Sequence, residues 1–244
     1  MAESNAPKIN QKPYVITNII RETPDVNIYS FRAQDGTRLD FEPGMFVMIT
    51  YSNPAANEKI TRAFSIASVP ESDTMEFFIG MVHGRFTSKL ETAKVGDIYY
   101  FTGPHGQFKF RPSNGDKVSF IAGGTGLAPF MSMLRYIKEK GLDTDVNLLY
   151  SVRYPNEVLR KGELDGFVNS LKMKMTVTVT RSDGAEGWAG EKGRIDSEMI
   201  KRAIPDLENR TTFICGPLGF VKAVKEHLKS LGYPDDKIRA DVWG

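Results

Sequence analysis

The sequence is poor in the residue types that build several common kinds of site. Its 244 residues contain a single cysteine, Cys215, which excludes an internal disulfide and leaves no set of thiolates for a zinc or iron-sulfur centre. The histidines, His83, His105 and His227, show no metal-ligand spacing. We therefore expect no metal site in this chain.

Long apolar runs and an excess of one charge are also missing. No stretch approaches the roughly 20 apolar residues of a transmembrane helix, and the polar start MAESNAPKINQK lacks the apolar core of a secretory signal. The formal net charge is only +2, from 32 basic and 30 acidic residues, and neither half of the chain has the basic character of a nucleic-acid-binding protein. We expect no membrane insertion and no nucleic-acid partner, with a cytoplasmic location as the default.

The residues that are present predict two folded domains. Hydrophobic residues make up 41% and charged residues 25%, which is close to the globular average, and the chain is long enough for two cores. RPSNGD, residues 111–116, is a turn-rich stretch of the kind that links domains. We expect the first domain to span residues 1–116 and the second residues 117–244.

The first half consists of short β-rich segments separated by turn-forming residues. Six segments have this character: PYVITNII, VNIYSF, MFVMITY, RAFSIAS, MEFFIGMV and DIYYF. Together with one short helical stretch, FTSKLETA, they predict a six-stranded antiparallel β-barrel.

The second half has a different rhythm, in which apolar runs alternate with helix-like stretches. The runs are KVSFIA, NLLYSV, MTVTVT, TTFICG and KIRADVW. In the first helix-like stretch, Phe130, Met133, Leu134 and Ile137 recur at helical spacing, and Gly141 is a suitable end. This alternation predicts an α/β domain with a parallel sheet covered on both faces, a type that binds nucleotides.

Two glycine-rich turns follow predicted strands in this half. FIAGGTGLAPF carries Gly123, Gly124 and Gly126 before a helix that has Pro129 in its first turn, and such a turn suits a pyrophosphate. The usual dinucleotide pattern has a third glycine where this chain has Pro129, and a tight turn without a ligand is the alternative. The second turn, TFICGPLGFV, would open onto the same crevice.

The first half carries its own candidate anion site. As a strand, RAFSIAS places Arg62, Phe64 and Ile66 on one face, and HGRFTSKL offers the hydroxyl of Thr87 at the start of a short helix. A surface ion pair and a helix cap are the simpler alternatives. An arginine, an aromatic ring and a helix start in one small barrel indicate a flat cofactor that carries phosphate, and a flavin fits.

The ordered motifs resemble the ferredoxin-NADP reductase superfamily. Four of them carry the resemblance, which covers essentially residues 12–244: R-x-F-S at 62–65, G-x-F-T-S at 84–88, GGTGLAP at 123–129 and CGP at 215–217. The resemblance implies a flavin-binding barrel followed by a nicotinamide-nucleotide domain.

Roles for individual residues come with this resemblance. It implies that Ser65 lies near the flavin N5 edge and that Cys215 approaches nicotinamide C4, so these two are the expected catalytic residues. Strict strand alternation puts Ser65 opposite Phe64, so a bend or twist is required there. The implied flavin residues are Arg62, Phe64, Ser65, Arg85, Phe86, Thr87 and Trp243, and the implied nucleotide residues are Gly123, Gly124, Thr125, Gly126, Pro129, Cys215, Gly216, Pro217 and Leu218.

The choice of cofactors follows from finer features of the resemblance. Arg153, Arg181 and Arg194 match members that use NADPH, and guanidinium groups suit a 2′-phosphate, whereas Asp183 suits the ribose of NADH. We expect NADPH, with NADH as the alternative, and FAD rather than FMN. Trp243 resembles a tail residue that covers the flavin, and Asp241 is a weaker candidate for a proton relay.

Three functions fit these observations. The first is a flavin-dependent oxidoreductase that transfers electrons between NADPH and a one-electron carrier such as ferredoxin or flavodoxin. The second is an NADH-dependent flavoprotein reductase for an oxygenase, a cytochrome or free flavin. The third is a non-catalytic flavin- or nucleotide-binding module that keeps the fold.

Overall fold

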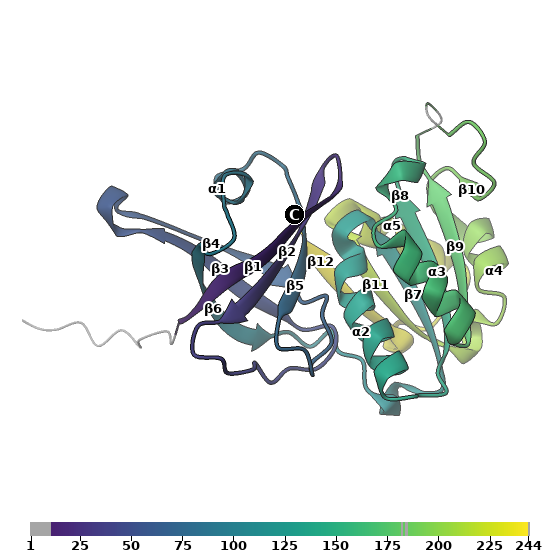
Figure 1. Ribbon diagram of the computed structural model, residues 1–244. Helices are drawn as coiled ribbons and strands as arrows, with labels where there is room; N and C mark the ends of the chain where they lie inside the picture. Colours follow the sequence, from purple (N-terminus) through teal and green to yellow (C-terminus); the bar gives the residue numbers. More distant parts are fainter. Residues whose placement is uncertain (1–10, 182, 184, 244) are drawn as a thin grey trace, which may run out of the picture.

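The computed structural model describes residues 11–181, 183 and 185–243 as two β-sheet domains (Figure 1). The start of the chain through Asn10, on which the expectation about a secretory signal depends, and the terminal Gly244 lie outside these ranges. No helix within the described part is long and apolar enough to cross a membrane.

The N-terminal domain is a six-stranded antiparallel sheet in the order β4-β3-β6-β1-β2-β5. Its strands are β1 (Lys12–Thr23), β2 (Val26–Ala33), β3 (Phe46–Asn53), β4 (Glu58–Ser65), β5 (Met75–Gly80) and β6 (Ile98–His105), and a short helix, α1 (Thr87–Glu91), precedes β6. The sheet curls so that its two edges meet, and the amide of Ala67, just after β4, donates a 2.8 Å hydrogen bond to the carbonyl of Glu76 in β5. Phe31 packs edge-on against Phe77 and Phe101 inside this barrel. The predicted six-stranded barrel is confirmed.

The second domain is a six-stranded parallel sheet in the order β10-β9-β8-β7-β11-β12. The strands are β7 (Lys117–Gly123), β8 (Asp145–Val152), β9 (Met173–Val179), β10 (Glu191–Lys192), β11 (Thr211–Pro217) and β12 (Ile238–Trp243). The helices are α2 (Ala128–Glu139), α3 (Lys161–Ser170), α4 (Ser197–Ala203) and α5 (Leu218–Ser230). The chain runs outward from β7 in one direction and returns to β11 on its other side, so the strand order reverses between β7 and β11. Open α/β sheets bind ligands at such a switch point.

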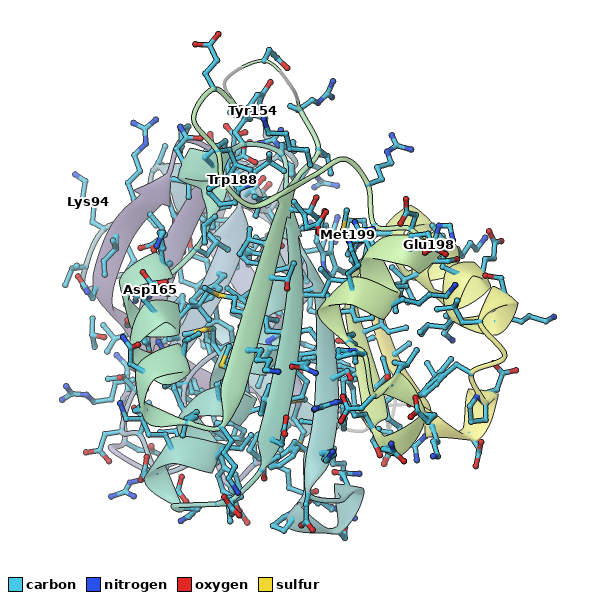
Figure 2. The ribbon with its side chains drawn as sticks, turned by 90° about the vertical axis from the view of Figure 1, so that its right-hand side faces the viewer. Lys94, Tyr154, Asp165, Trp188, Glu198 and Met199 are labelled. Atoms are coloured by element: carbon cyan, nitrogen blue, oxygen red, sulfur yellow. The ribbon has the colours of Figure 1, made fainter. Side chains whose placement is uncertain are left out.

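Helices cover both faces of this parallel sheet because its central strands are apolar on both sides. On β7, Phe120 faces the cluster formed with α2 and α3, whereas Ile121 faces the cluster formed with α4 and α5. Figure 2 shows α3, marked by Asp165, and α4, marked by Glu198, on opposite sides of the sheet. The predicted covering of both faces is confirmed.

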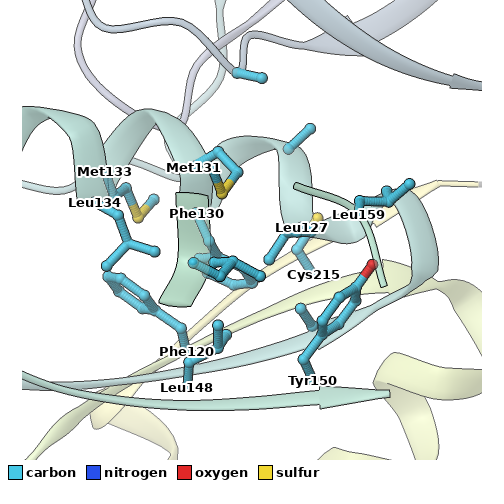
Figure 3. Packing of buried hydrophobic residues seen from close by; sticks show 14 of the residues in the cluster. Phe120, Leu127, Phe130, Met131, Met133, Leu134, Leu148, Tyr150, Leu159 and Cys215 are labelled. Atoms are coloured by element: carbon cyan, nitrogen blue, oxygen red, sulfur yellow. The ribbon is translucent and has the colours of Figure 1, made fainter. Parts of the chain in front are cut away.

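Helix α2 is buried between the parallel sheet and the barrel. Phe130 stacks on Phe120 of β7 with ring centroids 4.8 Å apart (Figure 3). It also meets Phe108, which follows the last barrel strand, edge-on with ring centroids 5.8 Å apart. The four residues expected on the apolar face of this helix have no exposed surface, and Gly141 has a φ of +60° just beyond its end. The predicted helix is confirmed, and it forms the centre of the domain interface.

Polar contacts from α2 fix the barrel against the second domain. The hydroxyl of Ser132 donates to the carbonyl of Ser68 at 2.7 Å. The guanidinium of Arg135 donates to the carbonyl of Ala67 at 2.8 Å, to the carboxylate of Glu76 at 2.9 Å and, through two nitrogens, to that of Glu163. Because these groups are mostly buried, water competes weakly for them.

Arg135→Met keeps the apolar stem of the side chain but removes the cation shared by two largely buried carboxylates, of which Glu163 loses its partner and Glu76 keeps only its ion pair with Arg160. We expect the free energy of unfolding, measured with urea, to fall by about 3 kcal/mol. Lys172→Met, which removes an exposed ion pair with Asp143, serves as the control and should have little effect. Equal losses in the two variants would show that the Arg135 contacts do not stabilise the fold.

Candidate functional site

Two adjoining cavities lie where the domains meet. The first has a volume of about 690 Å³ and is lined mainly by the barrel, and the second has about 310 Å³ and is lined mainly by the carboxyl ends of the parallel strands. The residues that line both cavities are Asp25, Val26, Thr125, Arg153 and Trp243. The volumes are typical of ligand sites, and the shared walls bring two ligands close together.

The edge strand β4 forms one wall of the first cavity. All four residues from Arg62 to Ser65 line it, because the cavity lies along the free edge and the end of this strand. This arrangement brings Ser65 and Phe64 to the same cavity and resolves the conflict with strict alternation. Arg62 is exposed, and its one hydrogen bond within the described ranges goes to the carbonyl of its neighbour Thr61. Its guanidinium is therefore available to an anionic group.

The loop before α1 also lines the first cavity. The Thr87 hydroxyl accepts a hydrogen bond from the amide of Gly84 at 2.9 Å and donates one to the carbonyl of Gly84 at 3.2 Å. Both bonds stay within the loop, so this hydroxyl stabilises the loop conformation. Phe86 is buried 5.4 Å from the ring of Phe64 and supports it. Arg85 is largely exposed and 4.0 Å from the carboxylate of Glu58, so it adds positive charge at the rim.

The glycine turn after β7 supplies the floor of the second cavity. Gly124 has a φ of +55° and opens a 3₁₀ turn over Gly124–Leu127, and its carbonyl accepts a hydrogen bond from the Tyr150 hydroxyl. A Cβ on Gly126 would lie 2.3 Å from the carbonyl oxygen of Cys215, so only glycine allows this turn to approach the end of β11. The two glycine-rich strand ends meet, as the sequence predicts.

Several residues expected at the ligands line neither cavity in this structure: Gly126, Pro129, Arg181, Arg194, Cys215, Gly216 and Leu218. Cys215 is completely buried beside Leu127 in the cluster under α2 (Figure 3). Pro217 and Trp243, which are paired between β11 and β12, line the second cavity instead. The approach of Cys215 to nicotinamide C4 therefore stays a prediction.

Ser65, Asp241 and Cys215 form a small group where the domains join. Cys215 and Asp241 are neighbours in the register of β11 and β12. Burial raises the pKa of the Asp241 carboxyl, while hydrogen bonds from the Val242 backbone and the Ser65 side chain partly offset this. Burial also raises the pKa of the Cys215 thiol, and the charge of Asp241 adds to that rise. Asp241 thus lies next to a serine that lines the first cavity.

The three arginines expected at a 2′-phosphate lie in different surroundings. Arg153 lines both cavities but forms ion pairs with Asp25 and Glu157, which balance its charge. Arg181 and Arg194 are exposed beyond the second cavity. In Figure 2, Tyr154 and Trp188 mark the loops at this end of the sheet, and the Tyr154 hydroxyl lies 3.2 Å from the carboxylate of Asp183.

The turn between β1 and β2 is a part of the site that the sequence does not predict. Thr23, Asp25 and Val26 all line the second cavity. The segment ETPD indicates only a turn, and nothing in its pattern shows that this turn reaches the other domain. Groups of acidic, histidine or cysteine side chains suited to a metal ion are absent from the described part of the chain.

Two family models of known proteins match successive parts of the chain. Residues 13–110 match the family model of the oxidoreductase FAD-binding domain, and residues 120–226 match that of the oxidoreductase NAD-binding domain. The fold and the two cavities thus define a protein that binds a flavin and a nicotinamide nucleotide.

Similar proteins place the chain in one family. The glycine betaine monooxygenase reductase subunit of Chromohalobacter salexigens is 32% identical over 232 residues, which cover 93% of this chain and 62% of that protein. The cytochrome b5 reductase domain of Ulva prolifera nitrate reductase superposes with a TM-score of 0.84 at 26% identity, covering 97% of this chain and 100% of that one. The ferredoxin reductase in carbazole 1,9a-dioxygenase superposes with a TM-score of 0.82 at 27% identity, covering 96% of this chain and 70% of that one. The chain belongs to the ferredoxin-NADP reductase superfamily.

Gly126→Ala should disrupt the contact between the two strand ends. We expect the free energy of unfolding to fall by about 2 kcal/mol or more, since the added methyl group has no space beside the Cys215 carbonyl. Gly166→Ala in the middle of α3 is the matched control, because nothing lies within 4 Å of its added methyl group. That variant should gain about 0.5 kcal/mol in urea unfolding from its better helix propensity. A tolerated Gly126→Ala would contradict the close approach.

Asp241→Asn should stabilise the protein at neutral pH. The folded-state pKa of Asp241 is raised, so its ionised form costs stability at pH 7, and this cost disappears as the pH falls through the raised pKa toward about 4. We expect a higher melting temperature than the wild type at pH 7 and no difference near pH 4. Asp236→Asn, at an exposed position before β12, should show no such pH-dependent gain. A lower melting temperature of Asp241→Asn than of the wild type at pH 7 would contradict a destabilising charge at this position.

Proposed function

We propose that this protein is a flavoprotein reductase that takes a hydride from NADPH and passes electrons singly to a separate carrier such as ferredoxin or flavodoxin. The observation that supports it most directly is the pair of adjoining cavities with common walls at Thr125 and Trp243. Bound FAD would accept a hydride from the nicotinamide and release electrons one at a time. The protein's contribution is placement, because hydride transfer needs the two rings in near contact.

Residues of the first cavity fit the chemical groups of FAD. The exposed guanidinium of Arg62 suits a phosphate oxygen, and Phe64, which packs against Phe86, offers an aromatic surface in the same cavity. Trp243 is 41% exposed and lines both cavities, so we infer that it covers the flavin until the nicotinamide takes its place. Asp241, whose carboxylate accepts a hydrogen bond from the Ser65 side chain, is the group we infer to relay a proton beside the first cavity.

The nucleotide preference would depend on Arg181 and Arg194. Both are exposed, whereas Arg153 is balanced by Asp25 and Glu157 and has less capacity to attract a 2′-phosphate. A guanidinium pairs with a phosphate through two hydrogen bonds, and this selects NADPH over NADH.

The second candidate function is an NADH-dependent reductase component that serves an oxygenase or a cytochrome. The ion pair between Arg153 and Asp25 favours this second function, because acidic groups at the nucleotide cavity suit a ribose without a phosphate. The similar proteins named above include a monooxygenase reductase subunit and a cytochrome b5 reductase domain. The chain spans 62% of the length of that reductase subunit, so the partner of the whole protein stays a proposal.

An anaerobic titration of the flavin-loaded protein with NADPH and, separately, with NADH tests the proposal. We expect the visible flavin absorbance to bleach at NADPH concentrations about tenfold lower, since one added charged hydrogen bond contributes about 1.5–3 kcal/mol. The double variant Arg181→Ala/Arg194→Ala should lose this preference without a change in the NADH titration. Arg38→Ala, which removes an exposed arginine paired with Asp73, is the control.

Other outcomes of this titration point to different functions. Bleaching that favours NADH supports the oxygenase or cytochrome reductase and directs the search for an acceptor accordingly. Flavin that binds but is not bleached by either nucleotide supports the non-catalytic module. A protein that takes up no flavin overturns the assignment of the first cavity.

A further inference from the structure

The turn between β1 and β2 belongs to the barrel but is fastened to the second domain. The backbone amide of Arg160 donates a 2.7 Å hydrogen bond to the carboxylate of Glu22, and Asp25 forms an ion pair with Arg153. In Figure 1 the purple tip of this hairpin lies at the boundary between the domains, near the C-terminal end of the described chain. Thr23 and Val26 pair across the base of the turn. The turn is therefore held on both sides of Thr23.

Thr23 is buried at the second cavity with an unused hydroxyl. Its exposed fraction is 6%, it lines the cavity, and its Oγ1 has no hydrogen-bond partner among the residues that the structure describes. Buried hydroxyl groups are almost always paired, because leaving one unpaired in a dry environment is unfavourable. A polar ligand in the cavity would supply the missing partner.

Charged and hydroxyl side chains next to Thr23 in this cavity, those of Arg153, Glu157 and Thr180, already have partners within the fold. Glu157 is paired with Arg153, and the Thr180 hydroxyl lies 3.3 Å from the carbonyl of Val152. The Gly123–Gly124 turn, also in the cavity wall, supplies backbone groups of the kind that approach phosphate. Thr23 and this turn thus line the same cavity, and the sugar-phosphate part of a nucleotide suits that combination.

We propose that Thr23 is a nucleotide-binding residue contributed by the flavin-binding barrel. Its hydroxyl hydrogen-bonds an oxygen of the ribose-phosphate part of the nicotinamide nucleotide, either a ribose hydroxyl or a phosphate oxygen. This inference rests on the proposed function. It means that the bound nucleotide contacts both domains. The contacts of Glu22 and Asp25 fix the turn beforehand, so little conformational freedom is lost when the nucleotide binds.

The test compares Thr23→Val, which has nearly the same shape without the hydroxyl, with Thr23→Ser, which keeps the hydroxyl. The binding of NADP⁺ and of NAD⁺ to the FAD-loaded protein is measured by calorimetry, and the melting temperature is measured without nucleotide. We expect Thr23→Val to bind about tenfold more weakly and Thr23→Ser to bind within about threefold of the wild type. Thr23→Val should also melt about 2 °C higher, because it removes a buried unpaired hydroxyl.

Thr212→Val is the matched control. Its hydroxyl is also buried, but it donates a 3.0 Å hydrogen bond to Tyr233 and lies outside the second cavity. This variant should melt at a lower temperature and bind both nucleotides as the wild type does. A higher melting temperature for Thr23→Val and a lower one for Thr212→Val would distinguish a hydroxyl that is unpaired within the fold from one that stabilises it.

Two results overturn the role of Thr23. One is unchanged nucleotide binding by Thr23→Val while the wild type binds normally. The other is a lower melting temperature of Thr23→Val together with weaker binding, which would make the hydroxyl structural. If the wild type binds neither nucleotide, the proposed function itself fails. This outcome differs from the two results that overturn the role of Thr23.

Discussion

The candidate site depends on helix α2 being buried on two sides at once. One side packs on the parallel sheet through Phe130 and Phe120, and the other packs on the barrel through Phe130 and Phe108. Ser132 and Arg135 then bond carbonyl groups of the barrel directly after β4. Since β4 carries the wall of the first cavity and the turn before α2 carries the wall of the second, this single helix fixes the distance between the two ligand sites.

A close backbone contact gives the second domain its crevice. Gly126 lets the turn after β7 touch the carbonyl of Cys215 at the end of β11, at the point where the strand order reverses. The glycine therefore serves the packing of two strand ends as much as the approach of a phosphate. Cys215 is covered because its side chain lies in the apolar cluster under α2, and Pro217 and Trp243 form the cavity wall instead.

Much of the fold could be predicted because its signals are local. The apolar face of α2 and the glycine turns can be read from neighbouring residues, and the same holds for the alternation of strands and helices. The site was predicted less completely. Arg62, Phe64 and Thr125 line the expected cavities, whereas Arg153 is occupied by carboxylates and Cys215 is covered. The pairing of Arg153 with Asp25 joins residues 128 positions apart, and no local pattern reports such a contact.

The sequence by itself determined the two domain types, their order, and the cofactor classes that their motifs indicate. These properties depend on periodicity and on the conformational demands of glycine and proline, which act within a few residues. Only the tertiary structure decided which side chains share a cavity, which charges are balanced and which hydroxyl is left unpaired. Those properties depend on how the barrel is seated against α2, and the turn at Thr23 becomes part of a nucleotide cavity only because that packing brings it there.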